Sequence, residues 1–253
     1  MTPEASIMAH CVAYFPDAER SMAAALGLAD GGADYIEVQF PFSDPTADGP
    51  AIQTACRDAL ESGFTVDRGF SLLTELSANT SVPLCIMSYA NLLYRRGIDR
   101  FCREAAAAGA RGLIVPDLLP PYDEGLYRIC REQGLDALPV ISPNISDKRL
   151  AAIAKTGPRF IYTTLRSGIT GSRTEVGEEQ RGHLQRCRAT GAHIMAGFGI
   201  ESPEQVAALA PHCDTLVAGS FFVKRLMEIG PGGSTHAYRK RMRQGIEYLY
   251  GAK

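Results

Sequence analysis

The residues that could do chemistry begin with three carboxylates that lie close together. Glu37 lies inside the apolar segment Tyr35–Val38, and Asp44 and Asp48 follow it in a loop that contains several prolines. Burying a lone carboxylate is costly, so Glu37 is expected to face a polar cavity, where desolvation would raise its pKa. The prolines stiffen the loop by fixing φ, so the loop could hold one carboxylate against the strand end. The segment predicts an acid–base pair; an exposed carboxylate at a sheet edge is the alternative for Glu37.

Three glycine-containing loops predict a site for a phosphate group. One contains Gly168 and Gly171, the second is Gly197–Gly199, and the third, Gly219–Ser220, precedes an expected short helix at Phe221–Met227. Glycines let backbone N–H groups approach an anion, and a helix N-terminus attracts negative charge. A tight turn would explain each glycine alone, but three such loops at successive strand ends favour a phosphate.

The other expected strand ends are mostly apolar. They include Met87, Ile114, Ile141, Tyr162 and Phe198. Such residues at the mouth of a cavity indicate either a flat, apolar part of a substrate or the ordinary core extending upward, and the sequence leaves both open.

The elements that must position these residues alternate between short apolar runs and longer amphipathic ones. The expected strands are Met8–Ala13, Tyr35–Val38, Leu84–Met87, Gly112–Val115, Leu138–Ile141, Phe160–Thr163, His193–Ala196 and Thr215–Val217. The expected helices include Ala18–Ala29, Ala51–Leu60, Arg100–Ala108, Leu126–Glu132, Lys148–Ala154, Glu178–Ala189, Pro203–Ala210 and one within Pro231–Lys253.

This alternation predicts the fold class. Eight strands in 253 residues leave about 32 residues for each strand–helix unit, the size typical of a (β/α)8 barrel. We therefore expect an α/β fold, a single-domain TIM barrel over residues 1–253, with the active site at the C-terminal ends of the strands. An open, doubly wound sheet is disfavoured because Tyr14–Asp17, which follows the first strand, contains no glycine for a phosphate loop.

Composition and charge argue against several classes of protein. The 26 basic and 28 acidic residues give a net charge of −2, without the basic patch that a nucleic-acid binder needs. No apolar run is long enough for a membrane span, and an N-terminus with Glu4 and no basic region does not resemble a signal peptide. We expect a cytoplasmic protein.

The cysteines and histidines indicate neither a disulfide framework nor a metal site. The seven cysteines form an odd set without a C-x-x-C motif, and they are expected to be reduced and buried. His10 and His193 lie in expected strands, as core or pocket residues. His183, His212 and His236 are expected to face solvent.

The chain resembles the tryptophan synthase alpha chain family in a series of motifs. The most specific is Glu37 followed by Pro-Phe-Ser-Asp-Pro-Thr-Ala-Asp-Gly-Pro at residues 41–50. The glycine loops are shared with other phosphate-binding barrels. The resemblance continues, in order and at the family's spacing, through Tyr89–Asn91, Ile114–Leu118, Tyr162, Arg166–Gly171, Gly197–Gly199 and Gly219–Ser220.

The resemblance implies cleavage of indole-3-glycerol phosphate to indole and glyceraldehyde 3-phosphate, without a cofactor. Glu37 would be the acid–base group, Asp48 would accept a hydrogen bond from the indole N–H, and Tyr162 would support the substrate beside Glu37. The phosphate would be held by Thr170, Gly171, Gly199, Gly219 and Ser220. The indole pocket would be lined by His10, Met87, Ile114, Ile141 and Phe198.

The implied partner is a beta chain that uses pyridoxal phosphate and receives indole through a tunnel, in an alpha2-beta2 complex. Loops after the second and sixth strands would form a lid and the contact face. Asp44, Pro45 and Asn91 match contact positions there.

The chain departs from the family pattern in three places. His10 stands where phenylalanine is usual, and Gln39 and Phe40 stand where a glycine and a small aliphatic residue are usual. Only nine residues precede His10, so the helix that plugs the barrel bottom in many members is expected to be absent or reduced.

Two other functions remain as alternatives. A different phosphate-binding barrel, such as an isomerase or a synthase, would usually place a lysine at a strand end, and the expected strands contain none. A non-catalytic subunit that only activates its partner is disfavoured because both Glu37 and Asp48 are present.

Overall fold

The architecture is a ring of parallel strands surrounded by helices. A computed structural model describes residues 6–165, 177–197 and 199–251. Its strands are β1 (Ser6–Val12), β2 (Tyr35–Gln39), β3 (Leu84–Met87), β4 (Ala110–Ile114), β5 (Asp136–Leu138), β6 (Val140–Ile141), β7 (Phe160–Thr164), β8 (His193–Gly197) and β9 (Thr215–Ala218). They form one sheet in the order β5-β4-β3-β2-β1-β9-β8-β7-β6, and the recorded pairs are parallel.

One proline explains why the nine strands of the described residues occupy eight positions in the barrel. Pro139 separates β5 from β6, and a proline has no N–H to donate to a strand ladder. Its carbonyl still accepts a hydrogen bond from the Tyr162 N–H, at 3.0 Å. Because β5 pairs with β4 and β6 pairs with β7, the two halves bring the ends of the sheet together. The predicted (β/α)8 barrel is confirmed.

Alternation along the strands separates an inner from an outer layer. Successive side chains of a strand point to opposite faces, so residues i and i+2 share one side of the barrel wall. The barrel interior holds Met8, Cys85, Met87, Tyr89, Ile114, Leu138, Phe160, Tyr162, Met195 and Val217. Intervening residues such as Ile7, Ile36 and Leu216 pack outward in the larger cluster beneath the helices.

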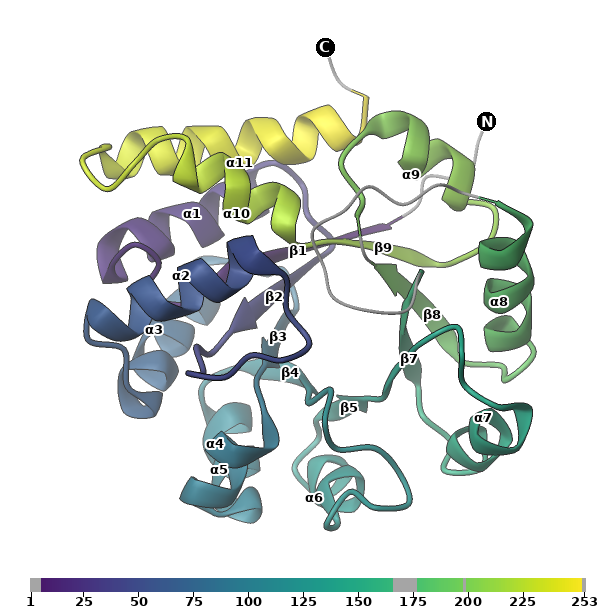
Figure 1. Ribbon diagram of the computed structural model, residues 1–253. Helices are drawn as coiled ribbons and strands as arrows, with labels where there is room; N and C mark the ends of the chain where they lie inside the picture. Colours follow the sequence, from purple (N-terminus) through teal and green to yellow (C-terminus); the bar gives the residue numbers. More distant parts are fainter. Residues whose placement is uncertain (1–5, 166–176, 198, 252–253) are drawn as a thin grey trace.

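The helices cover the outside of the strands, as Figure 1 shows. They are α1 (Ala18–Asp30), α2 (Pro50–Glu61), α3 (Val66–Asn79), α4 (Ala90–Arg96), α5 (Ile98–Ala107), α6 (Leu126–Glu132), α7 (Asp147–Ala154), α8 (Glu178–Arg188), α9 (Pro203–Leu209), α10 (Ser220–Met227) and α11 (Thr235–Leu249). Within the described ranges, none of them is long and apolar enough to cross a membrane. The Asp17 and Ser202 side chains cap α1 and α9 by accepting a backbone hydrogen bond.

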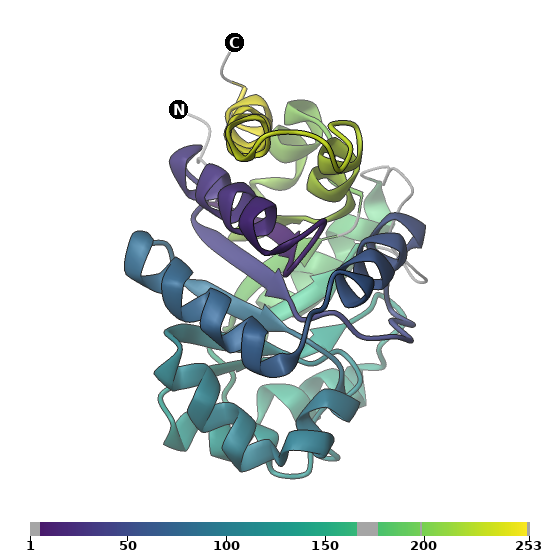
Figure 2. The ribbon, with the colours of Figure 1, turned by 90° about the vertical axis from the view of Figure 1, so that its left-hand side faces the viewer.

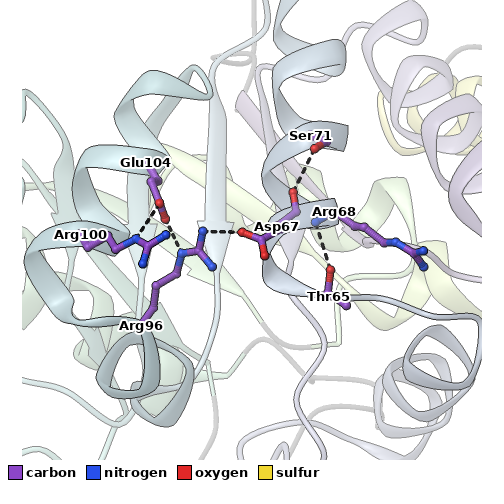
Figure 3. A network of polar contacts seen from close by, with 7 residues as sticks. All are labelled: Thr65, Asp67, Arg68, Ser71, Arg96, Arg100 and Glu104. Carbon is purple, nitrogen blue, oxygen red and sulfur yellow. Dashed lines mark hydrogen bonds and ion pairs between the residues drawn. The ribbon is translucent and has the colours of Figure 1, made fainter.

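Two helices that the sequence analysis did not list, α3 and α4, lie between β2 and α5 in the chain. Arg96, at the end of α4, joins both neighbours: its guanidinium contacts Asp67 in the first turn of α3 and Glu104 of α5 (Figure 3). Arg100 also donates to Glu104, at 2.9 Å. This network fixes α3 and α5 relative to each other beneath the C-terminal rim of the barrel.

The first and last helices pack unusually closely. Figure 2 shows α1 and α11 side by side. A Cβ atom at Gly27 of α1 would lie 2.2 Å from the backbone oxygen of Arg239 in α11, and one at Gly31 would lie 2.8 Å from that of Arg243. Glycine at these two positions therefore lets the helix backbones approach, which joins the two ends of the described chain.

Candidate active site

A cavity opens at the C-terminal ends of the strands. It encloses about 580 Å³ of space, counting the open solvent at its mouth. It is lined by His10, Glu37, Ala47, Asp48, Ile52, Met87, Ile114, Pro116, Val140, Tyr162, Gly199, Val217, Gly219 and Ser220. These residues come from strands on all sides of the barrel and from the loops that follow them.

Glu37 enters this cavity from β2 and is paired with a histidine of the neighbouring strand. His10 and Glu37 are register partners in the parallel ladder of β1 and β2, so their side chains lie on the same face. Nδ1 of His10 lies 2.9 Å from Oε1 of Glu37, and both residues are buried. The other carboxyl oxygen, Oε2, is buried and has no hydrogen-bond partner among the described residues.

Asp48 lies in the loop after β2, and two side chains from outside this loop donate hydrogen bonds to it. Its Oδ2 atom accepts hydrogen bonds from Nε2 of Gln39, at 2.7 Å, and from the hydroxyl of Tyr89, at 2.9 Å. The Tyr89 oxygen in turn accepts a hydrogen bond from the Ala47 N–H, at 3.1 Å. The turn itself is closed by a bond from the Asp48 N–H to the carbonyl of Pro45.

The surroundings of Asp48 shift the pKa of its carboxyl group in opposing directions. Burial raises the pKa of the Asp48 carboxyl, whereas the hydrogen bonds from Gln39 and Tyr89 and the nearby His10 work in the opposite direction. Burial and the Asp48 charge also raise the pKa of Tyr89, so this phenol stays protonated and donates. The pKa of Asp48 is raised overall, and the donors limit that rise because they favour the ionised form.

Tyr162 supplies a further hydroxyl from β7. It lines the same cavity and is buried. Burial, with the Glu37 and Asp48 carboxyl groups nearby, raises its pKa well above the usual value for a phenol, so it remains a donor. Gly197 of β8 leaves room for this ring, because a Cβ atom there would lie 3.3 Å from the Tyr162 hydroxyl.

One side of the cavity has the features of an anion site. Gly199, Gly219 and Ser220 line it, and Ser220 is the first residue of α10. The free N–H groups at a helix N-terminus favour a bound anion. Gly199 has a φ angle of +74°, which side chains other than glycine rarely adopt. Three further residues predicted for the substrate, Thr170, Gly171 and Phe198, lie outside the described residues.

The apolar wall includes two of the three strand residues predicted for it. Met87 and Ile114 line the cavity, but Ile141 is buried in the outer layer and its neighbour Val140 lines the cavity instead. The alternation of β6 explains this placement, since only one of two consecutive residues can face the barrel interior. Val217 of β9 completes this wall.

The histidines and cysteines confirm some expectations and correct one. The prediction that His183 faces solvent is wrong. His183 lies on the buried side of α8, and its Nε2 atom is 2.6 Å from the Thr163 hydroxyl oxygen. His212 is half-buried and His236 is exposed. His193 bonds to Thr215 at 2.8 Å. All seven cysteines are free and buried, as predicted.

Two residues that contact Asp48 had no role in the sequence analysis. The sequence marks Gln39 only as a departure from a family pattern, and Tyr89 only as part of the family motif Tyr89–Asn91. The alternation of β2 places Gln39 two residues beyond Glu37 and therefore on the same face. A second polar residue two positions after a carboxylate in the same strand is the signal that could have identified Gln39.

The side chains that line this cavity can exchange a proton with a bound molecule, and the same cavity can hold an anion. Glu37 has one carboxyl oxygen fixed by His10 and one without a described partner, which suits proton transfer. Asp48 is placed to stabilise positive charge. Among the described residues, none that lines the cavity is a lysine, so these residues offer no amine for a Schiff base with the substrate.

Comparisons with known proteins agree on one family. The family model described as tryptophan synthase alpha chain matches residues 2–248. A curated tryptophan synthase alpha chain from Helicobacter hepaticus is 38% identical, covering 98% of this chain and 97% of that protein. One from Methanosarcina barkeri is also 38% identical, covering 89% and 85%.

Solved structures show the same relationship. A tryptophan synthase structure from Mycobacterium tuberculosis contains a chain similar to this one with a TM-score of 0.89 and 30% identity, covering 99% of this chain and 93% of that chain. A mutant tryptophan synthase alpha-subunit from Pyrococcus furiosus gives a TM-score of 0.88 and 30% identity, covering 99% and 100%.

Proposed function

The chain belongs to the tryptophan synthase alpha chain family, and on that premise we propose that Glu37 and Asp48 carry the acid–base chemistry of its reaction. Members of the family cleave indole-3-glycerol phosphate within the tryptophan synthase complex, and this chain is an enzyme subunit with that lyase activity. The observation that carries the assignment of residues is the single cavity that both carboxyl groups line.

Cleavage of the bond between indole C3 and the glycerol chain needs two proton transfers. Protonation of C3 turns the ring into an iminium-like electron sink. Removal of the proton from the hydroxyl on the adjacent carbon then lets the aldehyde C=O form. The carbon–carbon bond breaks, and its electron pair restores the aromatic ring. One carboxyl group that gives a proton to C3 and takes one from the hydroxyl ends in its starting state, and we assign this role to Glu37.

Asp48 is assigned to the ring nitrogen. The N–H becomes positively charged when C3 is protonated, and an ionised carboxylate that accepts its hydrogen bond stabilises that charge. Gln39 and Tyr89 support this role because both donate to Asp48 Oδ2 and so favour the ionised form. Tyr162 would support the substrate from the opposite strand as a neutral donor.

The phosphate is assigned to the helix N-terminus at the cavity. Gly199, Gly219 and Ser220 would hold it through backbone N–H groups and the serine hydroxyl. Thr170 and Gly171 remain part of this proposal from the sequence motif alone, as does Phe198 for the indole pocket. Val140 takes the place predicted for Ile141 in that pocket.

The partner of this subunit is the tryptophan synthase beta chain, in an alpha2-beta2 complex. One solved neighbour is described as the a2b2 complex of Pyrococcus furiosus, with a TM-score of 0.88 and 32% identity to this chain. Of the three residues that match contact positions, Asp44 and Asn91 are exposed and Pro45 is buried. We propose that Asp44 and Asn91 touch the partner, whereas Pro45 shapes the loop.

Two broader proposals accompany this function. We propose that residues 1–253 act as one domain, because the packing of α1 on α11 joins both ends of the described chain. We also propose that the protein works in the cytoplasm, where its seven free thiols would stay reduced.

A steady-state assay of indole release from indole-3-glycerol phosphate, with and without a beta chain, tests the proposed function. Glu37→Gln keeps the size of the side chain but cannot exchange a proton, so it should abolish indole release. Binding of glycerol 3-phosphate at the anion site should remain. Turnover of the Glu37→Gln variant close to that of the unmodified protein would remove Glu37 from the acid–base role.

A further inference from the structure

His10 is the residue in closest polar contact with Glu37. It lies beside Glu37 in the β1–β2 ladder, and its Nδ1 atom is 2.9 Å from Glu37 Oε1. A carboxylate oxygen only accepts, so the contact requires an N–H at Nδ1 when Glu37 is ionised. That N–H is present in the protonated imidazole and in one of its two neutral tautomers.

The two residues each leave one polar atom without a described partner. Nε2 of His10 and Oε2 of Glu37 are both buried and unpaired within the described part of the chain, and both residues line the cavity. Buried polar atoms without partners are destabilising. An arrangement of this kind is expected where a bound substrate completes the hydrogen bonds.

We propose that His10 is a positioning residue for Glu37, a role that rests on the acid–base function proposed above for Glu37. The Nδ1–H donor holds Oε1 and thereby turns Oε2 toward the substrate, where it gives and takes the proton. A carboxyl group without this contact could rotate and present either oxygen.

The cysteine and tyrosine side chains near the pair stay neutral beside Glu37. Cys11 on β1, Cys85 on β3 and Tyr162 on β7 all feel the Glu37 charge. Burial raises the pKa of Cys11 to about 12 and raises the pKa values of Cys85 and Tyr162 as well, so all three stay neutral at pH 7. Asp48 from the loop after β2 also faces the pair, and it is retained in every His10 variant.

Two substitutions test the hydrogen bond. His10→Phe keeps an aromatic ring and removes the donor. His10→Asn can place an amide N–H close to the position of Nδ1, which keeps the donor. His193→Phe is the matched control, because His193 is a strand histidine at the first position of β8, at the opposite end of the barrel.

The measurement is kcat and KM for indole release between pH 5.5 and 9, in the complex with a beta chain. His10→Phe should lower kcat about tenfold with little change in KM, as expected for a misplaced reacting group. His10→Asn should recover most of that loss at pH 7.5, because it keeps the donor to Glu37. His193→Phe should keep the unmodified profile.

Two outcomes would overturn the proposal. One is a His10→Phe variant with unchanged kcat and pH profile, and the other is a His10→Asn variant no better than His10→Phe. Thermal unfolding and glycerol 3-phosphate binding identify a variant that has failed to fold. If His10→Phe fails to fold, the kcat of His10→Asn decides alone, and a value tenfold below that of the unmodified protein would overturn the proposal. Activity in Glu37→Gln would instead refute the role of Glu37 itself, so the two failures are distinguishable.

Discussion

Gln39 Nε2 lies 2.7 Å from Asp48 Oδ2, and this contact joins the end of β2 to the loop that follows it. Gln39 is fully buried, so its amide is shielded from bulk solvent. The same oxygen accepts the Tyr89 hydroxyl, so two donors from different strand ends fix one carboxyl group. The orientation of the loop carboxylate is therefore set by the barrel rather than by the loop alone.

Asp48→Asn should lower kcat for indole release by 10²-fold or more, the usual effect of losing a group that stabilises transition-state charge. The asparagine oxygen would take the two donors, Gln39 and Tyr89, which leaves an NH2 group to face the indole N–H. The asparagine NH2 group and the indole N–H are both donors, so no hydrogen bond forms between them. Steady-state kinetics measure this effect, and an unaffected rate would exclude Asp48 from the mechanism.

Gln39→Leu should move the acid side of the kcat profile to higher pH. The Gln39 hydrogen bond lowers the pKa of Asp48 against the effect of burial, so its loss raises that pKa further. If Asp48 must be ionised to act, more of the enzyme is then inactive at low pH. We expect the loss to be largest at pH 5.5 and small at pH 8. A loss that is the same at every pH would show that Gln39 acts only through packing.

Much of the fold could be predicted because each strand and the helix that follows it form one continuous stretch of sequence. β3 and α6 begin and end at the expected residues, and the other expected strands differ by a few residues at their ends, since apolar runs covered on both faces are easily identified. The strand expected at Leu138–Ile141 is divided by Pro139, which was visible in the sequence. Its presence could also have indicated that Val140 faces the cavity.

The contacts of the site could be predicted less completely. Glu37 and Asp48 were identified from their types and spacing, but the His10–Glu37 pair depends on the register between β1 and β2. Closure of the whole barrel fixes that register, and no short sequence pattern predicts it. His183 was misplaced for a similar reason: α8 is strongly polar, and only its one buried stripe, with Leu184 and Cys187, turns the histidine inward.

Ser220→Asp should raise the KM for indole-3-glycerol phosphate at least tenfold with a smaller change in kcat. The new carboxylate would stand at the first residue of α10, where the substrate phosphate is expected, and like charges repel. Ser146→Asp is the control, because it adds the same charge at the N-cap of α7, outside the cavity. Equal KM values for both variants would place the phosphate elsewhere.

Gly27→Ala should destabilise the protein by about 2 kcal/mol or more, as overpacking of a tight contact does. The added Cβ atom would lie 2.2 Å from the backbone oxygen of Arg239, so α1 and α11 must separate. Gly182→Ala in α8 is the matched control, since a Cβ atom there meets nothing within 4 Å. It should stabilise the helix by about 0.5–1 kcal/mol. Urea unfolding measures both, and equal effects would contradict the packing argument.

His183 should make stability depend on pH between about 4 and 6.5. Burial lowers the pKa of His183 from its usual 6.5 to about 4, so between these values the unfolded chain binds a proton that the folded protein does not. Unfolding therefore becomes easier as the pH falls from 6.5 toward 4. From pH 7 to pH 5 this group should remove about 2 kcal/mol from the free energy of unfolding.

His183→Gln tests this dependence. Glutamine can still donate to the Thr163 hydroxyl but does not titrate, so the variant should lose less stability than the unmodified protein over the same pH range. Urea unfolding at pH 7 and pH 5 gives both differences. Carboxylates with lowered pKa values, such as Asp30 and Glu104, lose their contribution at lower pH and are present in both proteins. If the two proteins lose the same free energy between pH 7 and pH 5, His183 is not the group responsible.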